Sequence, residues 1–134
     1  MIVKNDYKKY DVDIPLFFAV DDNYSSFLAV AIKSIKDNCN KEYHYSVYIL
    51  HDGLKDKTVK VFKKYEDENF SFRFVNVKLK RLMYNSKLHT RDYYSKSTYY
   101  RLFIQNLFPK IDKALYLDSD IIVNGDISEL YFTD

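Results

Sequence analysis

The chain has 134 residues, of which 47% are apolar and 30% charged, which suits one folded domain and argues against a disordered chain. Its 21 Lys and Arg residues almost balance 19 Asp and Glu residues, so the formal net charge of +2 gives no reason to expect a nucleic-acid partner. A single cysteine, Cys39, excludes an intrachain disulfide and a cysteine-built zinc site, and two glycines exclude the glycine-rich loops that bind nucleotide phosphates.

Residues 1–13 are polar and charged, with no long apolar stretch and no cleavage-like site. We therefore do not expect this segment to be a signal peptide. No window of the chain approaches the ~18 uninterrupted apolar residues of a membrane span. Together with the lone cysteine, these features predict a cytoplasmic protein without a transmembrane segment, either free or peripheral to the inner membrane face.

The first expected element is a strand buried on both faces, Ile14–Val20, which ends abruptly at the polar residues 21–23. A helix follows, and Ser25 or Ser26 is in the right place to cap it. The apolar residues expected on one face of this helix are Phe27, Leu28, Ala31, Ile32 and Ile35.

The middle of the chain predicts two further strands with a helix between them. Residues 43–50 form the second expected strand and residues 72–77 the third. Between them, Asp56 is expected to cap a helix over residues 57–68. Residues 78–96 show no clear periodicity and are expected to form a loop with at most one turn of helix.

The last part of the chain predicts one more helix, a fourth strand and a short final helix. The helix is predicted by apolar residues at i, i+3, i+4 and i+7, namely Tyr100, Phe103, Ile104 and Leu107. Pro109 ends this helix. Residues 113–117 predict a buried strand, and residues 121–123 a short extended piece. Asp126, with Glu129 three residues later, has the capping-box pattern of a helix start.

The alternation of strands and helices predicts an α/β fold with a mainly parallel sheet, right-handed crossovers and flanking helices. Such sheets bind ligands at the carboxyl ends of their strands. Two acidic clusters fall at such ends, Asp21 with Asp22 and Asp118 with Asp120. We therefore expect the ligand site at that edge.

Asp118 and Asp120 lie two residues apart where an apolar strand runs into a loop, so both carboxylates can converge on one hard cation. The alternative is a solvated strand end whose aspartates cap the next turn. A calcium loop is excluded because Ile122 and Val123 occupy its fifth and glycine positions. A phosphatase of the haloacid dehalogenase type is excluded because no Lys or Arg follows Lys113. The pair thus favours a metal-bound nucleoside-diphosphate sugar.

Three segments together resemble family 8 glycosyltransferases: AVDDNY at residues 19–24, STYYRL at residues 97–102 and LYLDSDIIVNGDISEL at residues 115–130. They keep the family's order and rough spacing, and the similarity runs from about Ile14 to Tyr131. Family members are retaining enzymes of the GT-A, Rossmann-like fold, and include bacterial lipopolysaccharide galactosyl- and glucosyltransferases and glycogenin. The resemblance implies that residues 14–134 are the nucleotide-sugar-binding part of a glycosyltransferase domain, preceded by a polar segment, residues 1–13.

The resemblance also implies a site for a UDP-hexose donor. Ala19 and Asp21 line the uracil site, with Asp21 accepting a hydrogen bond from the ring N–H. Asn23 faces the nucleotide, Tyr24 stacks on the base, and Arg101 reaches the diphosphate or the sugar. The residues alone leave structural alternatives open: Asp21 as a helix cap, Tyr24 packed on its own helix, and Arg101 as a surface residue.

Asp118 and Asp120 are the implied metal ligands, usually for Mn²⁺ with Mg²⁺ as the substitute. Asp118 also touches the donor sugar and ribose, with the Ser119 backbone nearby. Arg101 and Asp118 are thus the implied catalytic residues. A diphosphate leaving group gains charge as the glycosidic bond breaks, and without a glycine-rich loop a cation and a basic side chain must neutralise it.

The resemblance stops short of the whole family pattern. The third metal ligand is a histidine in a C-terminal segment that this sequence does not contain, and we expect His44, His51 and His89 to be surface or packing residues. We also expect the acceptor half of the domain to be absent, so that a second copy or a partner chain covers the exposed sheet edge.

Two functions remain as hypotheses. The first is the donor-binding half of a retaining glycosyltransferase that moves a hexose from a UDP-sugar to a glycan or lipid-linked saccharide of the lipopolysaccharide type. The second is a non-catalytic nucleotide-sugar-binding or interaction module. Transfer or UDP-hexose hydrolysis by the chain, with and without Mn²⁺, distinguishes them.

Overall fold

A computed structural model describes residues 10–77 and 104–134. Within these residues the chain forms a four-stranded sheet in the order β3-β2-β1-β4, and every neighbouring pair is parallel. The strands are β1 (Asp13–Ala19), β2 (His44–His51), β3 (Phe70–Asn76) and β4 (Leu115–Tyr116). This confirms the predicted α/β fold with a mainly parallel sheet.

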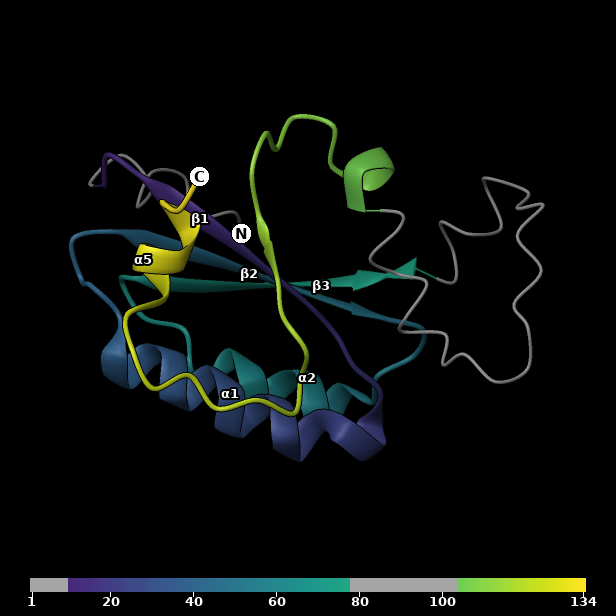
Figure 1. The fold of residues 1–134 in the computed structure, drawn as a ribbon. Helices are drawn as coiled ribbons and strands as arrows, with labels where there is room; N and C mark the ends of the chain where they lie inside the picture. The colour runs from purple at the N-terminus through teal and green to yellow at the C-terminus, as the bar shows by residue number, and fades with distance from the viewer. Residues whose placement is uncertain (1–9, 78–103) are drawn as a thin grey trace.

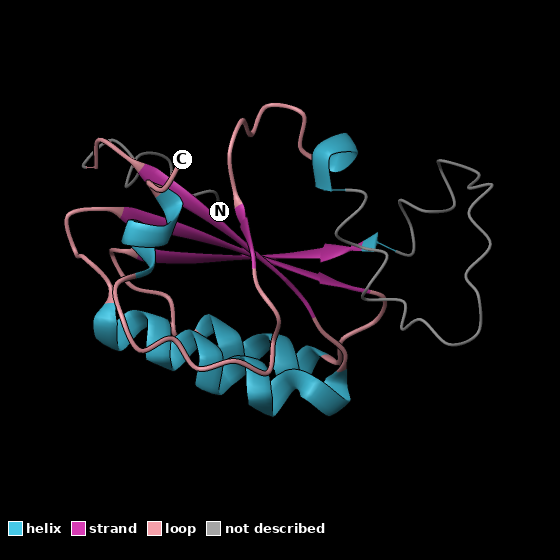
Figure 2. Cartoon of the chain, viewed as in Figure 1, coloured by secondary structure: helices cyan, strands magenta, loops and turns pink. Residues whose placement is uncertain are grey.

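Helices lie on both faces of the sheet (Figures 1 and 2). They include η2 (Asp22–Tyr24, a 3-10 turn), α1 (Ser25–Asn38), α2 (Asp56–Lys63) and α5 (Ile127–Tyr131). Helices α1 and α2 cover one face, and a helical turn at residues 104–107 lies on the opposite side of the sheet. Among the described residues, no helix is both long enough and apolar enough to span a bilayer.

The two central strands, β1 and β2, are buried on both faces, as their apolar runs predict. On the α1 and α2 side, alternate residues of β1 and β2 pack on Leu28, Ile32 and Phe62, all almost fully buried. On the other side, the Phe17 and Tyr48 rings stack with centroids 4.6 Å apart. The Phe108 ring meets both of these rings edge-on. In a parallel sheet covered on both faces, ligands bind at the carboxyl ends of the strands, and those ends are where a site can form.

The predicted serine cap of α1 is wrong. Ser25 is the first residue of the helix, and its hydroxyl donates a 2.9 Å hydrogen bond to the Asp22 carbonyl. The cap belongs instead to η2, where Oδ1 of Asp21 accepts from the Tyr24 N–H. Phe27 was expected on the buried face but is 52% exposed, whereas Leu28 is buried. The Phe27 ring lies instead beside the Tyr24 ring, with centroids 5.7 Å apart.

Helix α2 is shorter than predicted. It begins at Asp56, which is therefore its first residue and not its cap, and it ends at Lys63. Residues 64–69 turn back towards β3, and Oδ1 of Asp67 accepts from the N–H groups of Asn69 and Phe70. This local acceptor competes with helix continuation, which explains the early end.

Residues 121–126 form a strap that runs along α1 from the carboxyl to the amino edge of the sheet (Figure 1). The short extended piece expected at residues 121–123 does not join the sheet. Instead Ser34 Oγ accepts from the Val123 N–H at 2.9 Å, and Asn38 donates to the Val123 carbonyl at 3.0 Å. The strap leads into α5, whose predicted N-cap, Asp126, is confirmed by its 3.0 Å bond from the Ser128 N–H.

Two predicted elements lie outside the described residues: the loop over residues 78–96, and the start of the helix that contains Tyr100 and Phe103. The described end of that helix, residues 104–107, is helical as predicted, and the Phe108 N–H bonds to the Ile104 carbonyl.

Candidate functional site

The two acidic clusters meet at one edge because β1 and β4 are parallel neighbours. Leu16 pairs with Leu115 and Phe17 with Tyr116, and the Leu117 N–H continues the pairing to the Phe17 carbonyl at 2.9 Å. Both strands therefore end at the same edge, β1 running into Asp21 and β4 into Asp118. This pairing confirms the expectation that both acidic clusters follow the carboxyl ends of parallel strands.

The turn after β1 presents its polar side chains to solvent. Asp21 and Asn23 are exposed, and the Tyr24 side chain is 50% exposed. Ala19, at the end of the strand, is 7% exposed and packs in the core on the face away from α1. A ligand approaching this edge thus meets a carboxylate, an amide and a phenol within four consecutive residues.

Two of the open structural alternatives are observed in this turn. Asp21 Oδ1 accepts the Tyr24 N–H at 3.0 Å, so Asp21 caps its own turn. The Tyr24 ring lies 5.7 Å from the Phe27 ring, one helical turn along. Neither contact removes the group from solvent, because the Asp21 carboxylate has a second oxygen and half of the Tyr24 side chain stays exposed.

Asp22 makes a long-range contact that the sequence did not reveal. Its Oδ1 accepts a 2.8 Å hydrogen bond from the Thr58 hydroxyl in α2 and a 3.4 Å bond from the Lys55 N–H. These partners lie 36 and 33 residues away along the chain. No local pattern distinguishes Asp22 from Asp21, so only the tertiary structure assigns the two carboxylates to different partners.

His51, at the carboxyl end of β2, is a packing residue as predicted. It is buried, and its Nδ1 accepts the N–H groups of Gly53 and Leu54, each at 3.1 Å. Burial lowers the pKa of His51, although the nearby carboxylates of Asp52 and Asp22 oppose this shift. The neutral imidazole therefore holds the loop between β2 and α2.

His44 is also confirmed as a packing residue, at the opposite edge of the sheet. It is buried, and its Nδ1 lies 2.6 Å from Asp13 Oδ1, which also accepts from Ser46. His89 lies outside the described residues.

Asp118 and Asp120 are exposed and Ser119 is half-buried, in the turn that follows β4. Among residues 10–77 and 104–134, no group of three or more His, Cys, Asp or Glu side chains is arranged to hold a metal ion. Two exposed carboxylates supply hard oxygen ligands, which suit Mn²⁺ or Mg²⁺ when phosphate oxygens or water complete the shell. Arg101 lies outside the described residues.

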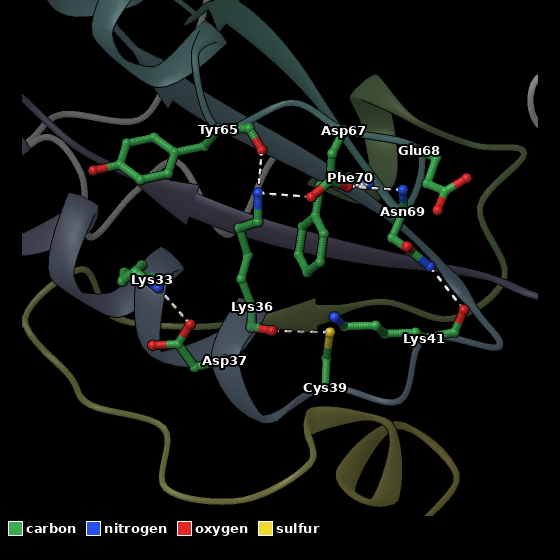
Figure 3. Close-up of a pocket in the computed structure, with 10 residues that line it drawn as sticks. All are labelled: Lys33, Lys36, Asp37, Cys39, Lys41, Tyr65, Asp67, Glu68, Asn69 and Phe70. Atoms are coloured by element: carbon green, nitrogen blue, oxygen red, sulfur yellow. Dashed lines mark hydrogen bonds and ion pairs between the residues drawn. The ribbon is translucent and has the colours of Figure 1, made fainter.

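A pocket of about 410 Å³ lies at the amino edge of the sheet, away from both acidic clusters (Figure 3). Its charges are largely paired: Lys36 Nζ lies 2.9 Å from Asp67 Oδ2 and donates to the Tyr65 carbonyl, and Lys33 pairs with Asp37. The positive charges of Lys33 and Lys36 are already neutralised by neighbouring carboxylates, so they attract an anionic ligand only weakly. This pocket therefore gives no reason to move the candidate site from the carboxyl edge.

Comparison with known proteins identifies relatives of this arrangement. Residues 15–134 match the model of Glycosyl transferase family 8. The chain is 32% identical over 115 residues to lipopolysaccharide 1,2-glucosyltransferase of Escherichia coli K12, covering 84% of this chain and 33% of that protein. It is 35% identical over 118 residues to glycosyltransferase GlyB of Streptococcus pneumoniae, covering 87% of this chain and 28% of that protein.

Solved structures show the same fold. The bifunctional glycosyltransferase WbbM in its apo form has a TM-score of 0.74 and 31% identity, over 93% of this chain and 22% of that one. Galactosyltransferase LgtC in complex with donor and acceptor sugar analogues has a TM-score of 0.66 and 29% identity, over 90% of this chain and 43% of that one. The chain spans about a third of the length of the curated relatives that it matches.

Proposed function

Because the chain belongs to glycosyltransferase family 8 and has the GT-A fold of its structural neighbours, we propose that residues 14–134 bind a UDP-hexose donor at the carboxyl edge of the sheet. The bound donor serves transfer of the hexose, with retention of configuration, to a glycan or lipopolysaccharide-type acceptor. The observation that carries this proposal is the parallel pairing of β1 with β4, which brings both acidic motifs to one edge.

In this proposal the turn after β1 holds the nucleotide. The Asp21 carboxylate accepts the uracil N–H through the oxygen that does not cap Tyr24, and Asn23 faces the nucleotide. The exposed half of the Tyr24 ring stacks on the base, a contact that suits an aromatic side chain in an aqueous site. Ala19 lines the base site with a small side chain.

The turn after β4 holds the diphosphate end of the donor. Asp118 and Asp120 would bind Mn²⁺ or Mg²⁺, and the bound cation would neutralise the charge that the diphosphate gains as it leaves. Asp118 also contacts the donor sugar and ribose beside the Ser119 backbone, and Arg101 supplies a further positive charge. Exposure of both carboxylates favours this role, since a hard cation must reach them from water.

A second candidate is a nucleotide-sugar-binding module without transferase activity. Its donor contacts would be the same as those of the transferase. Transfer requires an acceptor hydroxyl held near the anomeric carbon in addition to a bound donor.

Titration of UDP into the chain by calorimetry, with Mn²⁺ and with EDTA, tests the donor site. We expect binding that strengthens with Mn²⁺, and its absence at every Mn²⁺ concentration would refute the site. Release of UDP from UDP-glucose or UDP-galactose, with and without a saccharide acceptor, then separates the two candidates, because only the transferase produces UDP faster when the acceptor is present.

A further inference from the structure

We propose that Asp22 is a positioning residue for the nucleotide-binding turn, acting through its hydrogen bond to Thr58 of α2. This inference rests on the proposed donor site and adds to it a residue that does not touch the donor. It assigns different roles to the adjacent aspartates: Asp21 faces the ligand, and Asp22 faces the protein.

The turn gains little support from the core through its own side chains. Helix η2 has three residues, Asp22–Tyr24, and none of them is buried. Its conformation therefore depends on hydrogen bonds: the Asp21 cap on Tyr24, the Ser25 hydroxyl on the Asp22 carbonyl, and the Asp22 side chain on α2. The first two bonds are internal to the segment, whereas the third ties it to a separate element.

Helix α2 is a firm anchor for that third bond. Thr58 lies in its first turn, and Phe62, one turn further on, is 1% exposed in the core. The loop before the helix is held by His51, which accepts the N–H groups of Gly53 and Leu54. Asp22 also reaches the Lys55 N–H at 3.4 Å, and a carboxylate at the start of a helix is favoured electrostatically.

The placement of the proposed ligand contacts follows from this link. Asn23 and Tyr24 come directly after Asp22, so a rotation of the unanchored turn would move the amide and the ring together. Fixing the turn before the donor arrives reduces the conformational entropy lost on binding. Loss of the Thr58 bond should thus weaken nucleotide binding without removing any group that touches the nucleotide.

The test measures UDP dissociation constants in the presence of Mn²⁺ for Thr58→Val, Thr58→Ser and Asp22→Ala. Thr58→Val keeps the shape of the side chain and removes the hydroxyl donor, and Thr58→Ser keeps the donor. Asp56→Asn, at an exposed carboxylate in the same first turn of α2, is the matched control. Thermal unfolding of each variant sets a temperature at which all of them are folded.

We expect Thr58→Val and Asp22→Ala each to raise the dissociation constant by about 3- to 10-fold, the size of one net hydrogen bond. Thr58→Ser and Asp56→Asn should bind like the wild type. The double variant Asp22→Ala/Thr58→Val should bind no worse than Asp22→Ala, since both changes remove the same bond. Amide exchange of Tyr24 should be faster in Thr58→Val and restored in Thr58→Ser.

Wild-type affinity in both Thr58→Val and Asp22→Ala, with only the melting temperature lowered, would overturn the positioning role and leave the donor site intact. Should Asp22→Ala fail to fold, the comparison of Thr58→Val with Thr58→Ser decides the question alone. If the wild-type chain itself does not bind UDP, the proposed function fails, and the inference fails with it for that separate reason.

Discussion

The backbone N–H of Asn40, just after α1, donates a 3.1 Å hydrogen bond to Oδ1 of Asp126, 86 residues further along the chain. The same oxygen accepts from the Ser128 N–H at 3.0 Å and caps α5. Asp126 thus fixes the far end of the strap that begins after Asp118 and Asp120. The turn that carries these two carboxylates is held on one side by β4 and on the other by the contacts of the strap with α1.

Replacing Asp126 with Ala should lower the free energy of unfolding by about 1–2 kcal/mol, because it removes both a helix cap and a link to α1. Urea denaturation measures the change. Glu129→Gln, at an exposed position in the same helix, should change stability by no more than about 0.5 kcal/mol. Equal effects of the two substitutions would show that Asp126 does not hold the strap.

The same contacts predict that Asp126 contributes to the stability of the protein in a way that is lost in acid. Burial alone would raise its pKa, but hydrogen bonds from Ser128 and Asn40 outweigh burial and hold the pKa of Asp126 below its usual 3.8. A carboxyl with a lower pKa in the folded state stabilises the protein fully above the unfolded value. This contribution is lost as the pH falls through the folded pKa. In Asp126→Asn, the free energy of unfolding should therefore fall less than in the wild type as the pH is lowered below about 4.

His51 should make stability fall at mildly acidic pH. Burial lowers the pKa of His51 below its usual 6.5, and protonation of Nδ1 would remove the acceptor of two backbone N–H groups. Because the folded pKa is the lower one, the contribution is complete above the unfolded value of about 6.5 and is lost as the pH falls through the folded pKa. The urea midpoint of the wild type should therefore decrease as the pH is lowered from about 6.5 through the folded pKa of His51.

His51→Asn supplies the control, since the Asn carbonyl can accept in place of Nδ1 and does not titrate. We expect its urea midpoint to change less over the same interval. His44→Asn should keep the decrease that is due to His51. If the decrease disappears in His44→Asn and persists in His51→Asn, His51 is not the source of the pH dependence.

The sequence predicted the first three strands well because each is a short apolar run bounded by polar residues. β1, for example, is buried at every position after Asp13. The fourth was expected to be a buried strand over residues 113–117, but β4 has two residues, Leu115–Tyr116, and both are only partly buried. The sequence predicted the position of the acidic clusters because they mark where the apolar runs end. It did not predict the start of α1, because an Asp21 cap followed by a 3-10 turn and a Ser25 cap followed by an α-helix are equally compatible with the local residues.

The long-range contacts could not be predicted from the sequence. The bond from Thr58 to Asp22 and the bond from Asn40 to Asp126 join residues 36 and 86 positions apart. No periodicity encodes such pairs, because their partners are chosen by how the loops cross the sheet edges. The metal and nucleotide roles came from the resemblance to a family and remain proposals at Asp21, Asp118 and Asp120.

Asp120→Asn should strongly weaken Mn²⁺-dependent UDP binding with little change in stability. The substitution keeps the size of the side chain and removes one of two carboxylates offered to a hard cation. Because Asp120 is exposed, the melting temperature of the Asp120→Asn variant should stay close to that of the wild type. Asp112→Asn, also at an exposed position near β4, is the control. Unchanged Mn²⁺-dependent affinity in Asp120→Asn would rule out the ligand role.

Tyr24 and Phe27 allow the stacking role to be separated from helix packing. Their rings are in contact and both side chains are about half exposed, at 50% and 52%. Removing either ring therefore costs a similar amount of packing, whereas only Tyr24 is proposed to touch the base. Stacking of a base on an aromatic ring contributes about 1–3 kcal/mol, so Tyr24→Ala should weaken UDP binding by roughly 5-fold or more. Tyr24→Phe should keep most of the affinity and Phe27→Ala nearly all of it. If Phe27→Ala weakens binding as much as Tyr24→Ala, the two rings act through the start of α1, and Tyr24 does not stack on the nucleotide.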